Sequence, residues 1–68
     1  MEQTELRRAI EAILFAAGER IEISRLAAVL EADEADITQA ADALANELSF
    51  DRRGIRVLKL DDGYQMVS

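Results

Sequence analysis

Apolar residues recur with helical spacing in the first segment of the chain. One face of that segment collects Leu6, Ile10, Ile13, Leu14 and Ala17. Spacing of three and four residues is typical of an amphipathic helix that buries one side. We expect Thr4 to cap the start of this helix and Gly18 to end it in a left-handed conformation.

The pattern predicts a short strand and a second helix in the next segment. Ile21 and Ile23 alternate with Glu22, which indicates a brief extended stretch. Ser24 is then the expected N-cap of a short helix. The apolar face of that helix consists of Leu26, Val29 and Leu30.

The longest apolar stripe predicts a third helix that reaches about Phe50. Asp33 precedes Asp36 by three residues, a spacing similar to that of a capping box, so the helix is expected to begin there. The residues of the stripe are Ile37, Ala41, Leu44 and Leu48. A continuous stripe of this kind faces a core.

The last segment changes to β-forming residues and predicts a hairpin. Two such runs, 55–60 and 64–67, flank Asp61, Asp62 and Gly63. Asp-Gly between two runs favours a tight turn, because these residues tolerate positive φ. The order of helix, short strand, helix, helix and hairpin predicts an α+β fold of the winged helix-turn-helix type, with the hairpin as the wing.

Length and composition predict one small domain over residues 1–68. A chain of 68 residues has room for a single core, and with no Cys and no His it lacks disulfides and the common zinc ligands. We expect no metal and no cofactor. The longest apolar run, 12–17, is too short to span a membrane. These features together predict a soluble, cytoplasmic protein without membrane contact.

Charge argues against direct nucleic-acid recognition. The net charge is -6, which repels phosphate backbones. The third helix would read the major groove in a DNA-binding winged helix, yet segment 34–50 contains no Lys or Arg. Gln39 and Asn46 could address adenine edges, but Asp42 lies between them on the same face. Strong DNA binding is therefore not expected.

Basic residues concentrate instead around the wing. They are Arg52, Arg53, Arg56 and Lys59. This cluster is a candidate for weak contact with a DNA backbone or an acidic partner. The alternative is that the neighbouring residues Asp51, Asp61 and Asp62 neutralise it within the chain, which contributes little stability at a surface.

Apolar residues outnumber the sites that one core can cover, which predicts self-association. Phe15 falls nearly opposite the apolar stripe of the first helix, so its ring needs a second surface, either the sheet of the same domain or another subunit. The wing has apolar residues on both faces, and one small domain cannot bury both. The candidate interface residues for a homodimer or another partner are Phe15, Ala12, Arg8, Val57, Leu58, Leu60, Tyr64 and Met66.

Catalysis is not expected. The hydroxyl residues have no His to act as base. The paired carboxylates at Asp33 and Asp36, and at Asp61 and Asp62, occupy capping and turn positions that account for them. The sequence contains no glycine-rich phosphate loop.

Three segments resemble the amino-terminal domain of the bacterial segregation and condensation protein B family: residues 9–19, residues 26–27 and residues 62–67. Arg20 departs from the family, which usually has Pro there. The resemblance implies a homodimer built from amino-terminal winged-helix domains. It also implies a kleisin partner, segregation and condensation protein A, and through it an SMC protein that organises the chromosome. A second, kleisin-gripping winged-helix domain is expected to be absent from this chain. The alternatives are a winged-helix transcription regulator and an unrelated scaffold module.

Overall fold

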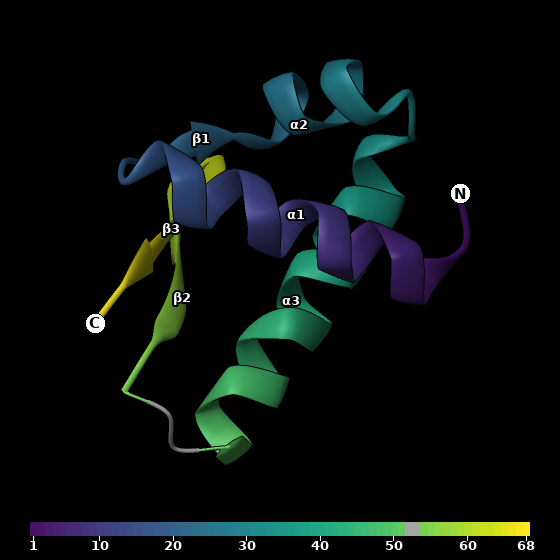
Figure 1. Cartoon of the computed structure of the whole chain (residues 1–68). Helices are drawn as coiled ribbons and strands as arrows, with labels where there is room; N and C mark the ends of the chain where they lie inside the picture. Colours follow the sequence, from purple (N-terminus) through teal and green to yellow (C-terminus); the bar gives the residue numbers. More distant parts are fainter. Residues whose placement is uncertain (52–53) are drawn as a thin grey trace.

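The computed structural model describes residues 1–51 and 54–68 and has the predicted order of elements (Figure 1). The elements are α1 (Gln3–Ala17), β1 (Ile21–Glu22), α2 (Ile23–Leu30), α3 (Glu34–Asp51), β2 (Arg56–Leu60) and β3 (Gly63–Val67). The third helix begins directly after Asp33, as expected. Three helices followed by a hairpin confirm the α+β winged helix-turn-helix fold.

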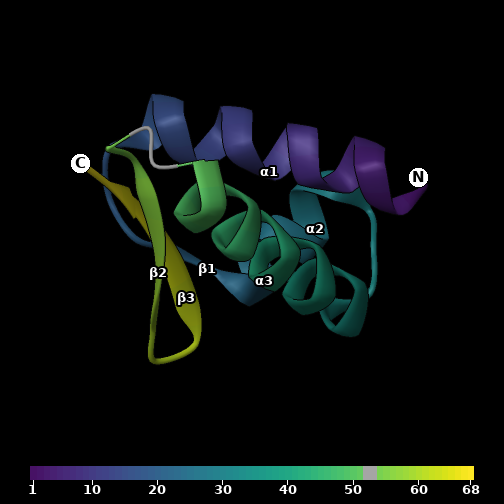
Figure 2. The same ribbon diagram turned by 90° about the horizontal axis from the view of Figure 1, so that it is seen from below.

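The strands form one antiparallel sheet in the order β1-β3-β2. In the hairpin Val57 pairs with Met66 and Leu60 with Gly63. The short extended stretch predicted from Ile21 is a true strand, because Ile21 pairs with Tyr64 on the other side of β3. The central strand is therefore β3, and β2 forms an edge. Figure 2 shows α1 crossing one side of α3, with the hairpin at the end of the molecule that carries the C-terminus.

The core lies between the helices and the inner face of the hairpin. Its buried residues are Leu6, Ile10, Leu14, Leu26, Ile37, Ala40, Ala41, Leu44, Leu48, Val57 and Tyr64. Most are aliphatic, and burying a large aliphatic side chain stabilises the fold by about 1.5–3 kcal/mol relative to exposure. Tyr64 is the one aromatic residue among them, so the hairpin is anchored by its largest side chain.

The ends of α1 differ in part from the prediction. Glu2, not Thr4, is the N-cap, and it forms a reciprocal capping box with Glu5. The backbone nitrogen of Glu5 donates to the carboxylate of Glu2 at 2.6 Å, and that of Glu2 donates back at 3.5 Å. Thr4 lies within the first turn, so its prediction as a cap was wrong. Gly18 ends the helix with φ 66°, which confirms the left-handed C-cap.

The start of α2 also differs from the prediction. The helix begins at Ile23, one residue before Ser24, and its N-cap Glu22 makes no side-chain hydrogen bond. The reason is tertiary, because β1 runs directly into α2. The backbone nitrogen of Ile23 donates to the carbonyl oxygen of Asp62 at 2.8 Å. The hairpin turn thus satisfies a helix-end donor that a capping side chain would otherwise serve.

The hairpin turn falls one residue earlier than predicted. Asp61 and Asp62 form it, and Asp61 has the positive φ of 57°. Gly63 is instead the first residue of β3. A Cβ atom at Gly63 would lie 2.7 Å from the carbonyl oxygen of Ile21. Glycine is needed here because β1 approaches closely, and the turn itself does not require it.

Candidate protein-interaction site

Phe15 projects from α1 away from the core, as its helical position predicted. Its side chain is 72% exposed, whereas its neighbour Leu14 is fully buried. The sheet of the same domain therefore does not enclose the ring. Two surfaces were considered for this ring, the sheet of the same domain and another subunit. Only the second is compatible with the structure.

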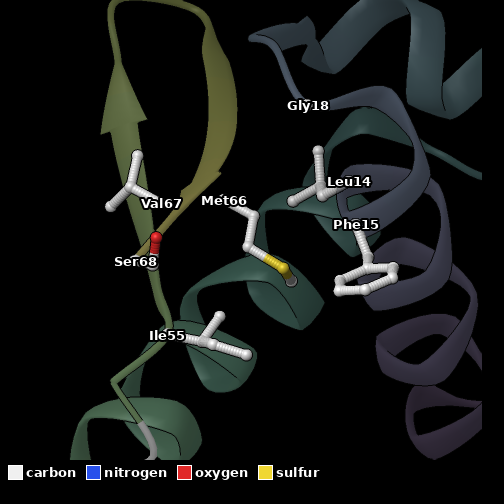
Figure 3. A pocket seen from close by; sticks show the side chains of 7 residues that line it. All are labelled: Leu14, Phe15, Gly18, Ile55, Met66, Val67 and Ser68. Atoms are coloured by element: carbon white, nitrogen blue, oxygen red, sulfur yellow. The ribbon is translucent and has the colours of Figure 1, made fainter.

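Two adjoining hollows lie beside Phe15, between α1 and the open end of the hairpin. The first has a volume of about 240 Å³ and is lined by Leu14, Phe15, Gly18, Ile55, Met66, Val67 and Ser68. The second has a volume of about 310 Å³ and is lined by Arg8, Glu11, Ala12, Phe15, Ile55 and Met66. Figure 3 shows the Met66 side chain extending toward the space between Ile55 and Phe15. Phe15, Ile55 and Met66 line both hollows, and we call the surface around these three residues the α1–wing groove.

Arg8 stands on the rim of this groove, but its charge is paired within the chain. Its Nη2 atom lies 2.7 Å from Oε1 of Glu47 on α3, and Nη1 lies 2.9 Å from Oε1 of Glu11. Arg7 adds a longer contact of 3.7 Å to Glu47. Exposed pairs of this kind contribute only about 0–1 kcal/mol each. The two contacts with Glu47 join α1 to α3 beside the groove, whereas the pair with Glu11 lies within α1.

The two faces of the wing have different surroundings. Val57 and Tyr64 are 7% and 1% exposed, so they belong to the core and cannot contribute accessible surface to an interface. Their assignment as partner contacts is corrected, because the inner face of the hairpin packs against α3. Leu58 and Leu60 point to the other side and remain 42% and 39% exposed. We call the surface formed by these two leucines the outer wing face.

A hydrogen bond ties the inner wing face to α3. The hydroxyl of Tyr64 donates to Oδ1 of Asp42 at 2.8 Å. Burial, the hydrogen bond and the nearby negative charge raise the pKa of Tyr64 to about 12. The phenol therefore stays protonated and can donate at any physiological pH. Asp42, expected on the outward face of the third helix, serves as its acceptor.

The basic cluster of the wing is only partly described. Arg52 and Arg53 lie outside the described residues. Arg56 and Lys59 are exposed on β2. The ammonium of Lys59 lies 5.9 Å from the centre of the Tyr64 ring, within the range of a cation–π contact.

The hairpin turn has a partner that the sequence analysis did not predict. Arg20, in the loop after α1, places Nη1 3.1 Å from Oδ1 of Asp62. In one of the two interpretations of the basic cluster, Asp62 neutralises the wing's own basic residues. Because the partners are 42 residues apart, no local pattern could have indicated this pair.

Ile55 belongs to the candidate site but was not among the predicted interface residues. It lines both hollows beside Phe15. A signal was available, because Ile55 has the same strand parity as Val57 and so faces inward. Glu47, which pairs with Arg8 across 39 residues, had no such signal.

The outward face of α3 lacks the features of a DNA-reading helix. Gln39, Asp42 and Asn46 are exposed, as predicted. The helix sequence, 34–51, contains no Lys or Arg. Phosphate neutralisation supplies much of the affinity for DNA, so this face does not favour a transcription regulator. Within the described residues, no helix combines the length and apolar character that crossing a bilayer would require.

Comparison with known protein families identifies relatives along nearly the whole chain. The family model of segregation and condensation complex subunit ScpB matches residues 8–68. Segregation and condensation protein B of Alkaliphilus oremlandii is 36% identical over 66 residues, covering 97% of this chain and 36% of that protein. The same protein of Lachnoclostridium phytofermentans is 38% identical over 66 residues, covering 97% and 35%. The chain thus spans about a third of the length of these curated relatives.

Solved structures of similar sequence share the fold. A crystal structure of a dimer of the ScpB N-terminal domain complexed with an ScpA peptide superposes with a TM-score of 0.87 at 29% identity, covering 96% of this chain and 82% of that one. ScpB from Mycobacterium tuberculosis superposes with a TM-score of 0.91 at 25% identity, covering 100% and 42%. The match of sequence and fold shows that this chain belongs to the family of segregation and condensation complex subunit ScpB and has the fold of its amino-terminal winged-helix domain.

Proposed function

We propose that this chain is the dimerising and kleisin-contacting domain of a chromosome segregation and condensation subunit that works with an SMC–kleisin complex. It acts by binding and catalyses no reaction. Residues 1–68 form one winged-helix domain that corresponds to the amino-terminal part of a longer subunit. The proposed location is the cytoplasm, with association to the nucleoid through its partners.

The observation that carries this proposal is the presence of two separate open apolar surfaces on one small domain. The α1–wing groove lies on the inner side of the hairpin, and the outer wing face lies on the opposite side. A subunit that holds a second copy of itself and also binds a kleisin segment needs two such surfaces. The similar ScpB domain solved as a dimer with an ScpA peptide supports both roles.

The proposed contact residues are those of the predicted set that keep accessible surface. They are Arg8, Ala12, Phe15, Leu58, Leu60 and Met66. Arg56 and Lys59, with Arg52 and Arg53, are proposed to make weaker contacts with an acidic segment of a partner. A weak contact with a DNA backbone is the competing role for these four residues.

Sedimentation of the chain at micromolar concentration tests the first role. We expect a dimer, and a purely monomeric chain would remove the central function. Titration with an ScpA peptide in a calorimeter tests the second role. Val29→Ala is a suitable control variant, because Val29 is 60% exposed but lies on α2, outside both surfaces. It should change neither association.

Binding to random duplex DNA at low salt separates this proposal from the regulator alternative. We expect no tight binding, because the third helix carries acidic residues and no basic ones. Tight association that weakens steeply with added salt would favour a DNA-binding role instead.

A further inference from the structure

β2 has an open edge. It is the terminal strand in the order β1-β3-β2, and within residues 1–51 and 54–68 no strand pairs with its outer side. Its residues Arg56, Leu58, Lys59 and Leu60 are all exposed. An open edge offers backbone donors and acceptors to another strand.

The register of the hairpin determines which residues face this edge. Leu60 pairs with Gly63 across a two-residue turn, where the hydrogen-bonded pair of such a hairpin falls. Leu60, Leu58 and Arg56 therefore form backbone hydrogen bonds to β3. Val57 and Lys59 alternate with these residues, so their N–H and C=O groups point to the open edge.

We propose that β2 pairs antiparallel with β2 of a second copy, about a two-fold axis through Leu58. The inference rests on the proposed function, because it describes how the homodimer forms. It joins the two three-stranded sheets into one continuous sheet. It also leaves the α1–wing groove free for the kleisin segment.

The side chains favour this register over its neighbours. About Leu58, the two Leu58 side chains face one another, Arg56 faces Leu60 of the second copy, and no like charges are opposed. An axis through Lys59 would set two ammonium groups opposite each other, which is destabilising. An axis through Val57 would place Leu60 opposite Gly54 of the second copy. Gly54 precedes β2, so Leu60 would lose its partner strand in this register.

Apolar cover and charge both support a second copy as the occupant of the edge. The outer wing face of each copy, 42% exposed at Leu58 and 39% at Leu60, gains cover from the same face of the other. Arg56 of one copy comes to lie beside the other copy's turn, which carries Asp61 and Asp62. A basic strand next to an acidic turn is self-complementary, as a two-fold interface requires.

A single cysteine tests the position of the axis. The sequence contains no Cys, so Leu58→Cys introduces the only thiol. Residues facing each other in a non-hydrogen-bonded antiparallel pair have Cα atoms about 4.5 Å apart, within the range of a disulfide. We expect mild oxidation of Leu58→Cys to convert most of the dimer to a covalent one.

Leu60→Cys is the matched control, because Leu60 lies on the same face with nearly the same exposure. Its counterpart in the second copy would be four residues further along the strand, roughly 13 Å away, so little covalent dimer should form. Equal cross-linking of the two variants, or none at Leu58→Cys in a chain that still sediments as a dimer, overturns the edge pairing and leaves the proposed function standing. A monomeric wild-type chain removes both.

Removing one edge donor gives an independent test. Lys59→Pro deletes an N–H group that faces the open edge, while the hairpin keeps its own bonds. We expect the dissociation constant of the dimer to rise about tenfold or more. Lys59→Ala loses the same side chain but keeps the N–H, so its dissociation constant should rise far less than that of Lys59→Pro. An unchanged dimer in a folded Lys59→Pro chain contradicts the inference. If that variant does not fold, the cysteine pair decides.

Hydrogen exchange distinguishes the second copy from a kleisin strand. If copies pair at this edge, the amides of Val57 and Lys59 gain protection as the chain concentration rises. Protection that appears only when an ScpA peptide is added would assign the edge to the kleisin and overturn the inference.

Discussion

Tyr64 on the central strand and Asp42 on α3 are joined by a hydrogen bond of 2.8 Å between the phenol and Oδ1. Tyr64 is 1% exposed, while Asp42 lies at the surface. The bond therefore runs from the core to its boundary. It joins the wing to the third helix, beside the apolar contacts that Val57 and Tyr64 make in the core.

Tyr64→Phe should lower the free energy of unfolding by about 0.5–1.5 kcal/mol, the usual net contribution of one hydrogen bond. The loss should stay at this level because Asp42 is exposed and water can replace the phenol. Urea unfolding followed by circular dichroism measures it. Asp42→Asn, which keeps an acceptor, should cost less than Tyr64→Phe, and the reverse order would argue against the bond.

Stability should fall at high pH because of the same residue. The folded pKa of Tyr64 is raised from 10.0 to about 12. Because folding raises this pKa, the contribution of Tyr64 to the free energy of unfolding is complete below about pH 10, which is the pKa in the unfolded chain. The contribution is lost as the pH rises through the pKa of the folded chain. Tyr64 is the only Tyr and the chain has no Trp, so ultraviolet absorbance follows its ionisation alone. A midpoint near 10 in the folded chain would contradict the prediction, and the Tyr64→Phe chain should lack this part of the stability loss.

Gly63→Ala should destabilise the fold by about 1–3 kcal/mol, as overpacking does. The added Cβ would meet the carbonyl oxygen of Ile21 at 2.7 Å, so β1 has to move. Gly18→Ala is the comparison, because no atom lies within 4 Å of its new Cβ and only its φ of 66° opposes it. Faster hydrogen exchange in β1 should appear for Gly63→Ala alone. Unchanged exchange there would show that β1 tolerates the methyl group.

Phe15→Ala should change the free energy of unfolding by no more than about 0.5 kcal/mol, since the ring is a surface group. If the α1–wing groove holds the kleisin segment, the same variant should weaken binding of an ScpA peptide by about 2 kcal/mol, as loss of an aromatic anchor does. Leu14→Ala, one residue earlier and fully buried, should instead cost about 2–5 kcal/mol of stability. Calorimetry and denaturant unfolding separate the two effects. Peptide affinity that is unaffected by Phe15→Ala would exclude the groove as the binding site.

Much of the architecture was accessible from the sequence because it depends on local periodicity. The spacing of Leu6, Ile10 and Leu14 identifies a helix with one buried side, wherever that side packs. The run of β-forming residues around Val57 identifies a strand, and the aspartates before Gly63 identify a turn to within one residue. The resemblance at 9–19 and 62–67 indicated the family that the comparisons confirmed.

Tertiary structure alone decided which apolar surfaces stay open. Periodicity shows that the wing has two apolar faces, but only the packing of α3 determines that Tyr64 is buried and Leu58 is exposed. Glu2 and Asp62 replaced the expected helix caps, and Gly63 was needed for β1, because each of these depends on a neighbour in space. Side-chain pattern along a strand or helix is a local property of the chain, whereas burial depends on distant segments that fold against it.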